Sequence, residues 1–386
     1  MKGNVFCLIK DMLQQEKSSV VKRNCGMENL HYAERIESDL KEIGTHIDRV
    51  SDEILDQIAK VLHSFIHRDV EGANEVVLGD RRINRKIEII DELVHAFVVR
   101  HAPSGKHLRY ASAVLRLSVA LERIGDYAGA IGRQIVRIES APPDRITKQI
   151  EMIAQQARYT LEKAIRAFQQ GDVESARETY WHSERSDHAL SLVFNEVMEL
   201  GSTAGISVVD VLGLSRVLML FRRMEEQAEN LSEQTVFAFS GEQRKPRVFR
   251  ILFLDEKHNL EAHVAEKYAT KAFPESGVYE SAGWNVEEDK YLEDDLVHFM
   301  DAKGLDLRHA RSKKLIPISE LSNHFHVVVV FSGDEGVADD FLGDVPFRTT
   351  VLHWKRSDVS DLDGLYQNVA GSVQKLLTIL AGTDAK

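Results

Sequence analysis

Hydrophobic residues between positions 36 and 161 recur every three or four residues, which is the period of helices that bury one face. The period is interrupted at 101–105 (HAPSG) and 141–144 (APPD), where proline and glycine are typical of helix ends. The pattern therefore predicts long helices joined by short turns. The positions that carry it are Ile36, Leu40, Ile43, Ile47, Val50 and Ile54, then Ile83, Ile87, Ile90, Val94 and Phe97, then Val114, Leu117, Leu121, Ile124, Ala128 and Ile131, then Ile146, Ile150, Ile153, Ala157 and Leu161.

A seven-residue segment that occurs twice indicates a tandem duplication. DVEGANE at 69–75 and DVESARE at 172–178 are identical at five of seven positions, 103 residues apart, and each lies at the foot of a long predicted helix. The spacing predicts one three-helix repeat at 30–140 and a second at 143–240. Their short connections predict antiparallel neighbouring helices.

After SGEQRKP (240–246) the period changes, and the apolar, β-branched run RVFRILFL is followed directly by a helical pattern. Further strand patterns, GVYESAGW, HFHVVVVFSG and TTVLHW, alternate with helical ones up to the closing helix LYQNVAGSVQKLLTIL. Alternating strands and helices predict a parallel sheet covered on both faces. The expected fold is therefore multidomain, α plus α/β: tandem three-helix bundles followed by a four-stranded parallel-sheet domain at residues 247–386.

Composition excludes some classes of protein. The formal net charge is -12 without a concentrated basic patch, so nucleic acid is not an expected partner. No apolar run approaches the roughly 18 residues of a transmembrane segment, and the start lacks the apolar core of a signal peptide. The two cysteines, Cys7 and Cys25, show no metal or disulfide spacing, so we expect a cytoplasmic protein. Residues 1–29 form an N-terminal extension without an assigned role, and Met27 is an alternative start of translation.

Two stripes of acidic residues accompany the buried faces of the first repeat. Glu122 and Asp126 lie one helical turn apart, where two carboxylates repel each other unless they face water, a cation or arginine. Facing stripes of oxygen donors could hold a divalent or ferric ion. Ordinary surface pairing with Arg81, Arg85 and Arg123 is the alternative. The stripe on the preceding helix consists of Asp80, Asn84, Glu88, Asp91 and His95.

The segments DRRINRKIEIIDEL (80–93) and LRYASAVLRLSVALERIGDYAGAIG (108–132) resemble the PhoU family of phosphate-signalling regulators, over about residues 30–240. The resemblance implies in each repeat an acidic D/E-x-x-x-D motif and an E-R-x-x-D-x-x-x-N motif that bind metal. In the first repeat Ala130 replaces the closing asparagine of the second motif. Asn84 takes the second acidic place of the other motif. The matching residues are Asp80, Glu122, Arg123 and Asp126.

The second repeat departs further from the motifs. In FRRMEEQAEN (221–230), Arg222 takes the place of the glutamate, Glu226 that of the aspartate, and Asn230 is retained. The other acidic motif falls near Ser183 and Asp187. We therefore expect at most one good metal site, in the first repeat. Its candidate ligands are Asp80, Asn84, Glu88, Glu122 and Asp126, with Glu226 and Asn230 as weaker candidates.

The carboxyl-terminal segments RILFLDEKHNLEAHVAE, ESAGW, DAKGLDLRHARSKKL and HWKRSDV resemble the low-molecular-weight protein tyrosine phosphatase and arsenate reductase family. That family's C-x5-R loop supplies a nucleophilic cysteine and an arginine that holds the oxyanion. Here Asp255 and Glu261 occupy those places, so the resemblance implies an inactive domain. Catalysis through Asp255, and binding of a cation or basic peptide by the altered loop, remain as alternatives. The degenerate site comprises Asp255, His258, Asn259, Glu261 and Asp358.

Taken together, the resemblances imply a non-catalytic regulator of phosphate uptake and phosphate signalling. Its expected partners are the ATPase of a phosphate transporter, a sensor histidine kinase, or both, and a homodimer is compatible with the sequence. One alternative is an arsenate reductase or tyrosine phosphatase regulated by the helical bundle. A metal-binding helical bundle is the other.

Overall fold

The chain divides into two compact units, Met1–Arg244 and Lys245–Lys386, close to the predicted boundary. The computed structural model describes residues 28–182, 186–203, 206–242, 248–286, 290–315, 325–332, 342, 345, 349–356 and 362–382. Most of the predicted N-terminal extension therefore lies outside the described residues. No helix in the described part of the chain is long and apolar enough to cross a membrane.

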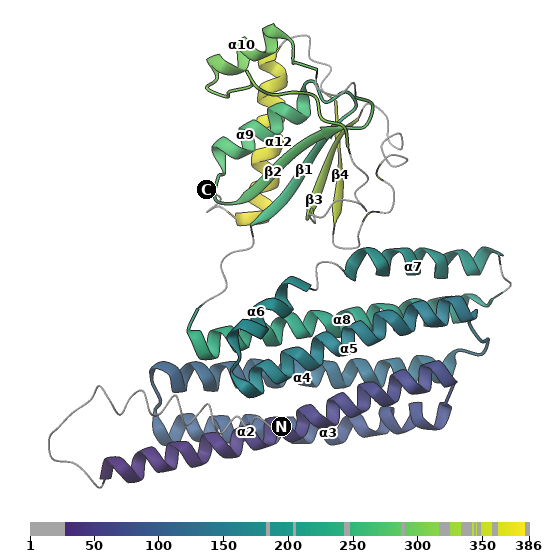
Figure 1. The fold of residues 1–386 in the computed structure, drawn as a ribbon, viewed down its shortest axis with the longest axis vertical. Coiled ribbons are helices and arrows are strands. Elements are labelled where there is room, and N and C mark those ends of the chain that lie inside the picture. Colours follow the sequence, from purple (N-terminus) through teal and green to yellow (C-terminus); the bar gives the residue numbers. More distant parts are fainter. Residues whose placement is uncertain are drawn as a thin grey trace. The chain divides into compact units, whose positions relative to one another are not determined.

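The first unit is helical throughout its described elements (Figure 1). Its first repeat consists of α2 (Glu28–His67), α3 (Val70–His101) and α4 (Gly105–Arg137). In the second repeat α5 (Asp144–Gln170) is followed by α6 (Val173–His182), α7 (Ser186–Thr203) and α8 (Val208–Ser240). The place of the single middle helix predicted there is thus taken by two helical segments, on either side of residues 183–185.

The duplicated segment begins equivalent helices in the two repeats. The side chain of Asp69 accepts a hydrogen bond from the backbone N–H of Gly72 at 3.0 Å, and that of Asp172 accepts one from the N–H of Ser175 at 3.0 Å. Such caps satisfy amides that have no partner within the helix. The aspartate shared by the segments 69–75 and 172–178 therefore caps the start of a helix in both repeats.

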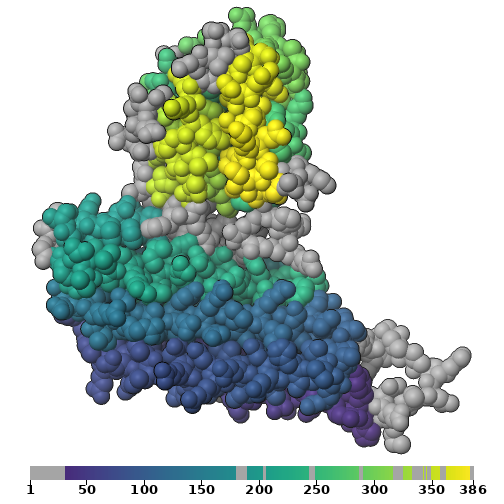
Figure 2. All heavy atoms as spheres, turned by 180° about the vertical axis from the view of Figure 1, so that it is seen from behind, coloured from purple at the N-terminus to yellow at the C-terminus, as the bar shows by residue number. Residues whose placement is uncertain are grey.

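The two repeats share one hydrophobic core, which extends from Ile36 to Ala238. Helices α4 and α8 pack together across the repeats, and α2 packs against α5. Figure 2 shows the first repeat, purple to blue, along one side of the helical unit and the teal helices of the second repeat along the other. The duplication has thus produced one bundle with a continuous interior.

The second unit is built on a four-stranded parallel sheet, as predicted, and the structure gives its strand order as β2-β1-β3-β4. Ile251 and Phe253 of β1 face one apolar core, which the helices join, and Leu252 and Leu254 face another, so both sides of the strand are buried. This explains the uninterrupted apolar run in the sequence. The elements are β1 (Phe249–Asp255), α9 (Glu261–Ala272), β2 (Gly277–Gly283), α10 (Asp294–Ala302), β3 (Val327–Ser332), β4 (Thr350–Lys355) and α12 (Leu362–Ala381).

Candidate functional site

The acidic stripes of the first repeat face each other across α3 and α4. A side chain built at Gly125 of α4 would lie 3.6 Å from Oδ1 of Asp80, which places Asp80 directly against that helix. Burial raises the pKa of Glu122, and the charges of Asp126, Asp91, Glu88 and Asp80 raise it further. The stripes on the two helices are therefore close enough to act on one another electrostatically.

Asp80 occupies the inner side of this cluster. Burial raises its pKa, Asp126 raises it further, and Arg133 opposes the effect. The Oδ1 atoms of Asp80, Asn84 and Asp91 are buried without a hydrogen-bond partner in the described structure. An unpaired buried oxygen is costly, and a cation would lower that cost.

The outer members of the cluster are solvent-exposed: Glu88, Glu122 and Asp126. No salt bridge in the described structure includes Arg81, Arg85 or Arg123, which were the expected surface partners. Among the described residues, no three His, Cys, Asp or Glu side chains converge closely enough to hold a metal ion. Metal binding would therefore require side chains of the cluster to change rotamer.

The corresponding part of the second repeat is already neutralised by its own arginine. Arg222 is buried on α8, and its Nη2 lies 3.4 Å from Oε1 of Glu226. Asn230 donates a hydrogen bond from Nδ2 to Gln227 Oε1 at 3.1 Å. The weaker candidate ligands thus have partners within α8. The side chains of Ser183 and Asp187 lie outside the described residues.

In the α/β unit, the side chain of Asp255 at the end of β1 bonds to backbone amides at the start of α9. Asp255 is 4% exposed, and its Oδ2 accepts hydrogen bonds from the backbone N–H groups of Ala262 at 3.0 Å and Leu260 at 3.4 Å. An anionic group is stabilised at a helix N-terminus, and amides there otherwise bind phosphate. Here the chain supplies the acidic group itself. A side chain on Gly283 would collide with the Asp255 carbonyl at 2.7 Å, so the loop also packs closely on β2.

Glu261, the first residue of α9, pairs with a cation that is distant in sequence. Glu261 is 1% exposed, and its Oε1 lies 3.4 Å from Nε of Arg356, which follows β4. Burial raises the pKa of Glu261, the ion pair with Arg356 lowers it, and nearby Asp255 raises it. An incoming oxyanion would meet two acidic side chains in the place of a cationic clamp.

His258 has a structural environment in this loop. Its Nδ1 accepts a hydrogen bond from the backbone N–H of Lys313 at 2.6 Å, and its Nε2 lies 2.8 Å from Ser281 Oγ. The ring stacks on His263 at 3.8 Å between centroids. Burial lowers the pKa of His258 to about 3, so the imidazole is neutral and Nε2 carries the proton. Asn259 is exposed, and Asp358 lies outside the described residues.

Sequence reasoning missed three members of this network: Arg356, Ser281 and His263. Ser281 donates a hydrogen bond to Glu266 and thereby links His258 to α9. The only local signal was the pair of basic residues Lys355 and Arg356 directly after a predicted strand. Their partner is far away in sequence, so periodicity could not identify it.

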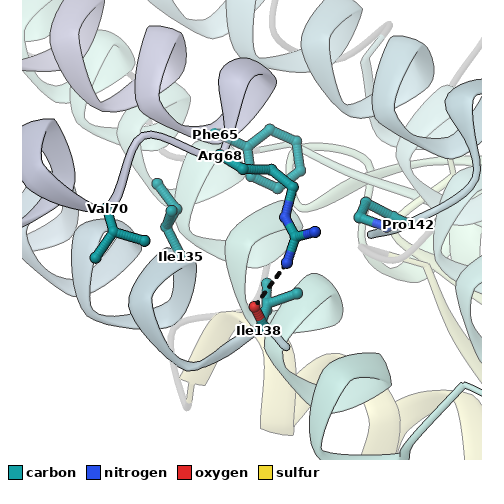
Figure 3. A pocket seen from close by; sticks show the side chains of 6 residues that line it. All are labelled: Phe65, Arg68, Val70, Ile135, Ile138 and Pro142. Carbon is teal, nitrogen blue, oxygen red and sulfur yellow. Dashed lines mark hydrogen bonds between the residues drawn. The ribbon is translucent and has the colours of Figure 1, made fainter. Parts of the chain in front are cut away.

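A cavity of about 270 Å³ lies near the turn between α2 and α3, next to the end of α4 (Figure 3). Its walls are largely apolar, with Phe65, Ile135 and Pro142 among them. The guanidinium of Arg68 donates hydrogen bonds to the carbonyl oxygens of Ile138 at 3.4 Å and Glu139 at 2.6 Å. Because its charged group is bonded to the backbone, this cavity offers little for ligand chemistry.

Comparison with known proteins agrees with the helical architecture. Residues 31–135 match the family model of the PhoU domain. The chain is 23% identical over 218 residues to the phosphate-specific transport system accessory protein PhoU homolog of Xylella fastidiosa, covering 56% of this chain and 92% of that protein. The crystal structure of the phosphate transport system regulatory protein PhoU from Streptococcus pneumoniae matches with a TM-score of 0.51 at 18% identity, covering 54% of this chain and 99% of that one. Residues 31–135 are therefore similar to the PhoU domain, and the helical unit has the fold of the solved PhoU structure.

The α/β unit has more distant structural relatives. An arsenate reductase in the phosphate-binding state covers 34% of this chain and 99% of its own, at 14% identity and a TM-score of 0.28. A likeness this low adds nothing to the strand order and loop geometry described above.

Proposed function

We propose that this protein is a non-catalytic regulator of phosphate uptake and phosphate signalling, which acts in the cytoplasm through contacts with the ATPase of a phosphate transporter, a sensor histidine kinase, or both. The observation that carries the proposal is the extent of the helical match, which spans 92% of a phosphate transport accessory protein. The relatives' names describe accessory and regulatory roles in phosphate transport. A long helical bundle also offers extended faces for partner proteins.

The loop geometry supports the absence of catalysis in the α/β unit. Asp255 is held by backbone amides at the start of α9, and Glu261, which the sequence resemblance aligns with the oxyanion-binding arginine, is buried. Neither side chain supplies the thiolate that attacks phosphorus or arsenic in the enzymes of this fold. The role of the α/β unit in the proposal is recognition.

A metal ion is a second element of the proposal. The partnerless buried oxygens of Asp80, Asn84 and Asp91 favour a divalent or ferric ion at the acidic cluster, with Glu88, Glu122 and Asp126 as the remaining candidate ligands. Bound there, the ion would neutralise the mutual repulsion of the acids. Metal analysis of protein purified without chelators tests this, with Asp80→Asn/Asp126→Asn as the variant expected to lose the metal.

The regulatory role can be tested in the source organism. Deleting the gene should alter phosphate uptake and the expression of phosphate-regulated genes, and the full chain supplied in trans should restore both. Co-purification of the transporter ATPase or the kinase with the full chain would identify the partner. Unchanged uptake and expression after deletion, in high and in low phosphate, would refute the proposal.

A further inference from the structure

In the α/β unit, a polar cavity of about 530 Å³ lies between β4 and α12. Figure 2 shows the two segments, in yellow-green and yellow, side by side on the face that is drawn. The cavity is within the size range of sites that bind small molecules. Its charged lining is basic, with Lys355 and Arg356 at the end of β4 and Lys375 on α12.

This concentration of positive charge runs against the composition of the chain, whose formal net charge is -12. Lys355 and Lys375 form no ion pair in the described structure, and Arg356 shares its charge with Glu261. Asn368 and Ser372 of α12 add an amide and a hydroxyl to the lining, next to Gln367, whose Nε2 already donates to Asp363 at 3.2 Å. Cationic side chains with neighbouring hydrogen-bond donors are the chemistry that recognises phosphoryl oxygens.

Gly371 provides an independent reason to expect a ligand here. It lies inside α12 and lines the cavity, and a side chain built on it would meet no atom within 4 Å. Glycine in a helix interior costs roughly 0.5–1 kcal/mol relative to alanine. No neighbouring atom requires this glycine, whereas a ligand lying close to the helix backbone would.

We infer that the cavity between β4 and α12 binds a small anion that carries several phosphoryl groups. Lys355 and Lys375 contribute two uncompensated positive charges from opposite walls, and Gly371 leaves the space between them open. A multiply charged anion matches this arrangement better than a single inorganic phosphate does. The inference does not depend on the proposed role in phosphate uptake, so either can fail alone.

Calorimetric titration of the full chain in buffer with a chelator tests the inference, with inorganic phosphate, tripolyphosphate and adenosine triphosphate as probes. Tripolyphosphate should bind, inorganic phosphate at least about tenfold more weakly, and both should weaken with salt. Tighter binding of the nucleotide than of tripolyphosphate would assign a contact to its base or sugar. Lys355→Gln and Lys375→Gln should each weaken binding about tenfold, the loss expected for one charge-assisted hydrogen bond.

Two further variants separate binding from folding. Gly371→Leu fills the cavity without changing charge, and it should abolish binding while leaving the melting temperature unchanged or raised. Lys314→Gln removes an exposed lysine beside β2, at the other edge of the sheet, and should leave affinity unchanged. Absence of tripolyphosphate and nucleotide binding to the wild type, or binding that survives Lys355→Gln/Lys375→Gln, would overturn the inference. Binding only of a phosphorylated peptide would also overturn it.

Discussion

The Oδ2 atom of Asp255 lies 3.0 Å from the backbone nitrogen of Ala262, so the last residue of β1 caps the helix that follows it. The amides of Leu260 and Ala262 at this helix start thereby have an acceptor within the chain. An anion at the same place would have to displace this buried acidic side chain.

Replacing Asp255 with alanine should loosen the start of α9. The loss of a capping acceptor and of partners for two amides is expected to cost about 1–3 kcal/mol of local stability. Hydrogen-exchange mass spectrometry of the full chain should show faster exchange at 260–272 in Asp255→Ala. Lys257→Ala, an exposed change in the same loop, is the control, and equal exchange in both variants would contradict the capping role.

Purified wild-type protein should not hydrolyse p-nitrophenyl phosphate above the background rate. Asp255 is 4% exposed and engaged with backbone amides, and Glu261 would repel an incoming dianion. The two cysteines of the chain, Cys7 and Cys25, lie outside the α/β unit. Turnover by the wild type that disappears in Asp255→Ala would show that the acid is a nucleophile.

Acidification should weaken the packing around His258. The pKa of His258 is lowered to about 3 by burial, so its folded pKa lies below the unfolded one. The stability that the neutral ring contributes is present above the unfolded pKa of about 6.5 and is lost as pH falls through the folded pKa. NMR titration should show no protonation of this imidazole between about pH 5 and pH 8.

His309, which is exposed, supplies the comparison for that experiment. His258→Asn should lower the stability of the α/β unit near neutral pH and reduce its loss on acidification, whereas His309→Asn should match the wild type. Titration of His258 with an ordinary histidine pKa would refute the hydrogen-bonded, neutral ring.

Glu122→Gln should stabilise the metal-free helical unit near neutral pH. The pKa of Glu122 is raised by burial and by the surrounding acids, so its contribution to stability is present below the unfolded pKa and lost as pH rises through the folded pKa. Glu122 is exposed, and solvent screening limits the expected gain to a few tenths of a kcal/mol at about pH 7. The gain should diminish towards about pH 4.

Urea unfolding in low salt with a chelator, followed by circular dichroism, would measure this difference. Glu92→Gln removes an exposed acid of α3 outside the interacting group and serves as the control. A gain for Glu122→Gln that is equal at both pH values would argue against repulsion as its cause. If added metal makes the same substitution destabilising, the acidic cluster binds that metal.

The sequence alone determined the features that depend on neighbouring residues. The helices of the first repeat follow from apolar periods of three to four residues, the sheet from short apolar runs between helical patterns, and the duplication from the repeated segment with its capping acids Asp69 and Asp172. These signals are local because a helix satisfies its own backbone and a cap reaches only three residues ahead.

Only the tertiary structure decided which of these side chains meet. Glu261 at the start of α9 pairs with Arg356, which follows β4, and the backbone amide of Lys313 donates a hydrogen bond to His258. Glu122 faces Asp80 because α3 and α4 pack against each other, while the buried Arg222 pairs with Glu226 in the second repeat. Such pairings depend on how remote segments are brought together in the core, and a linear pattern of polar and apolar residues does not encode those distances.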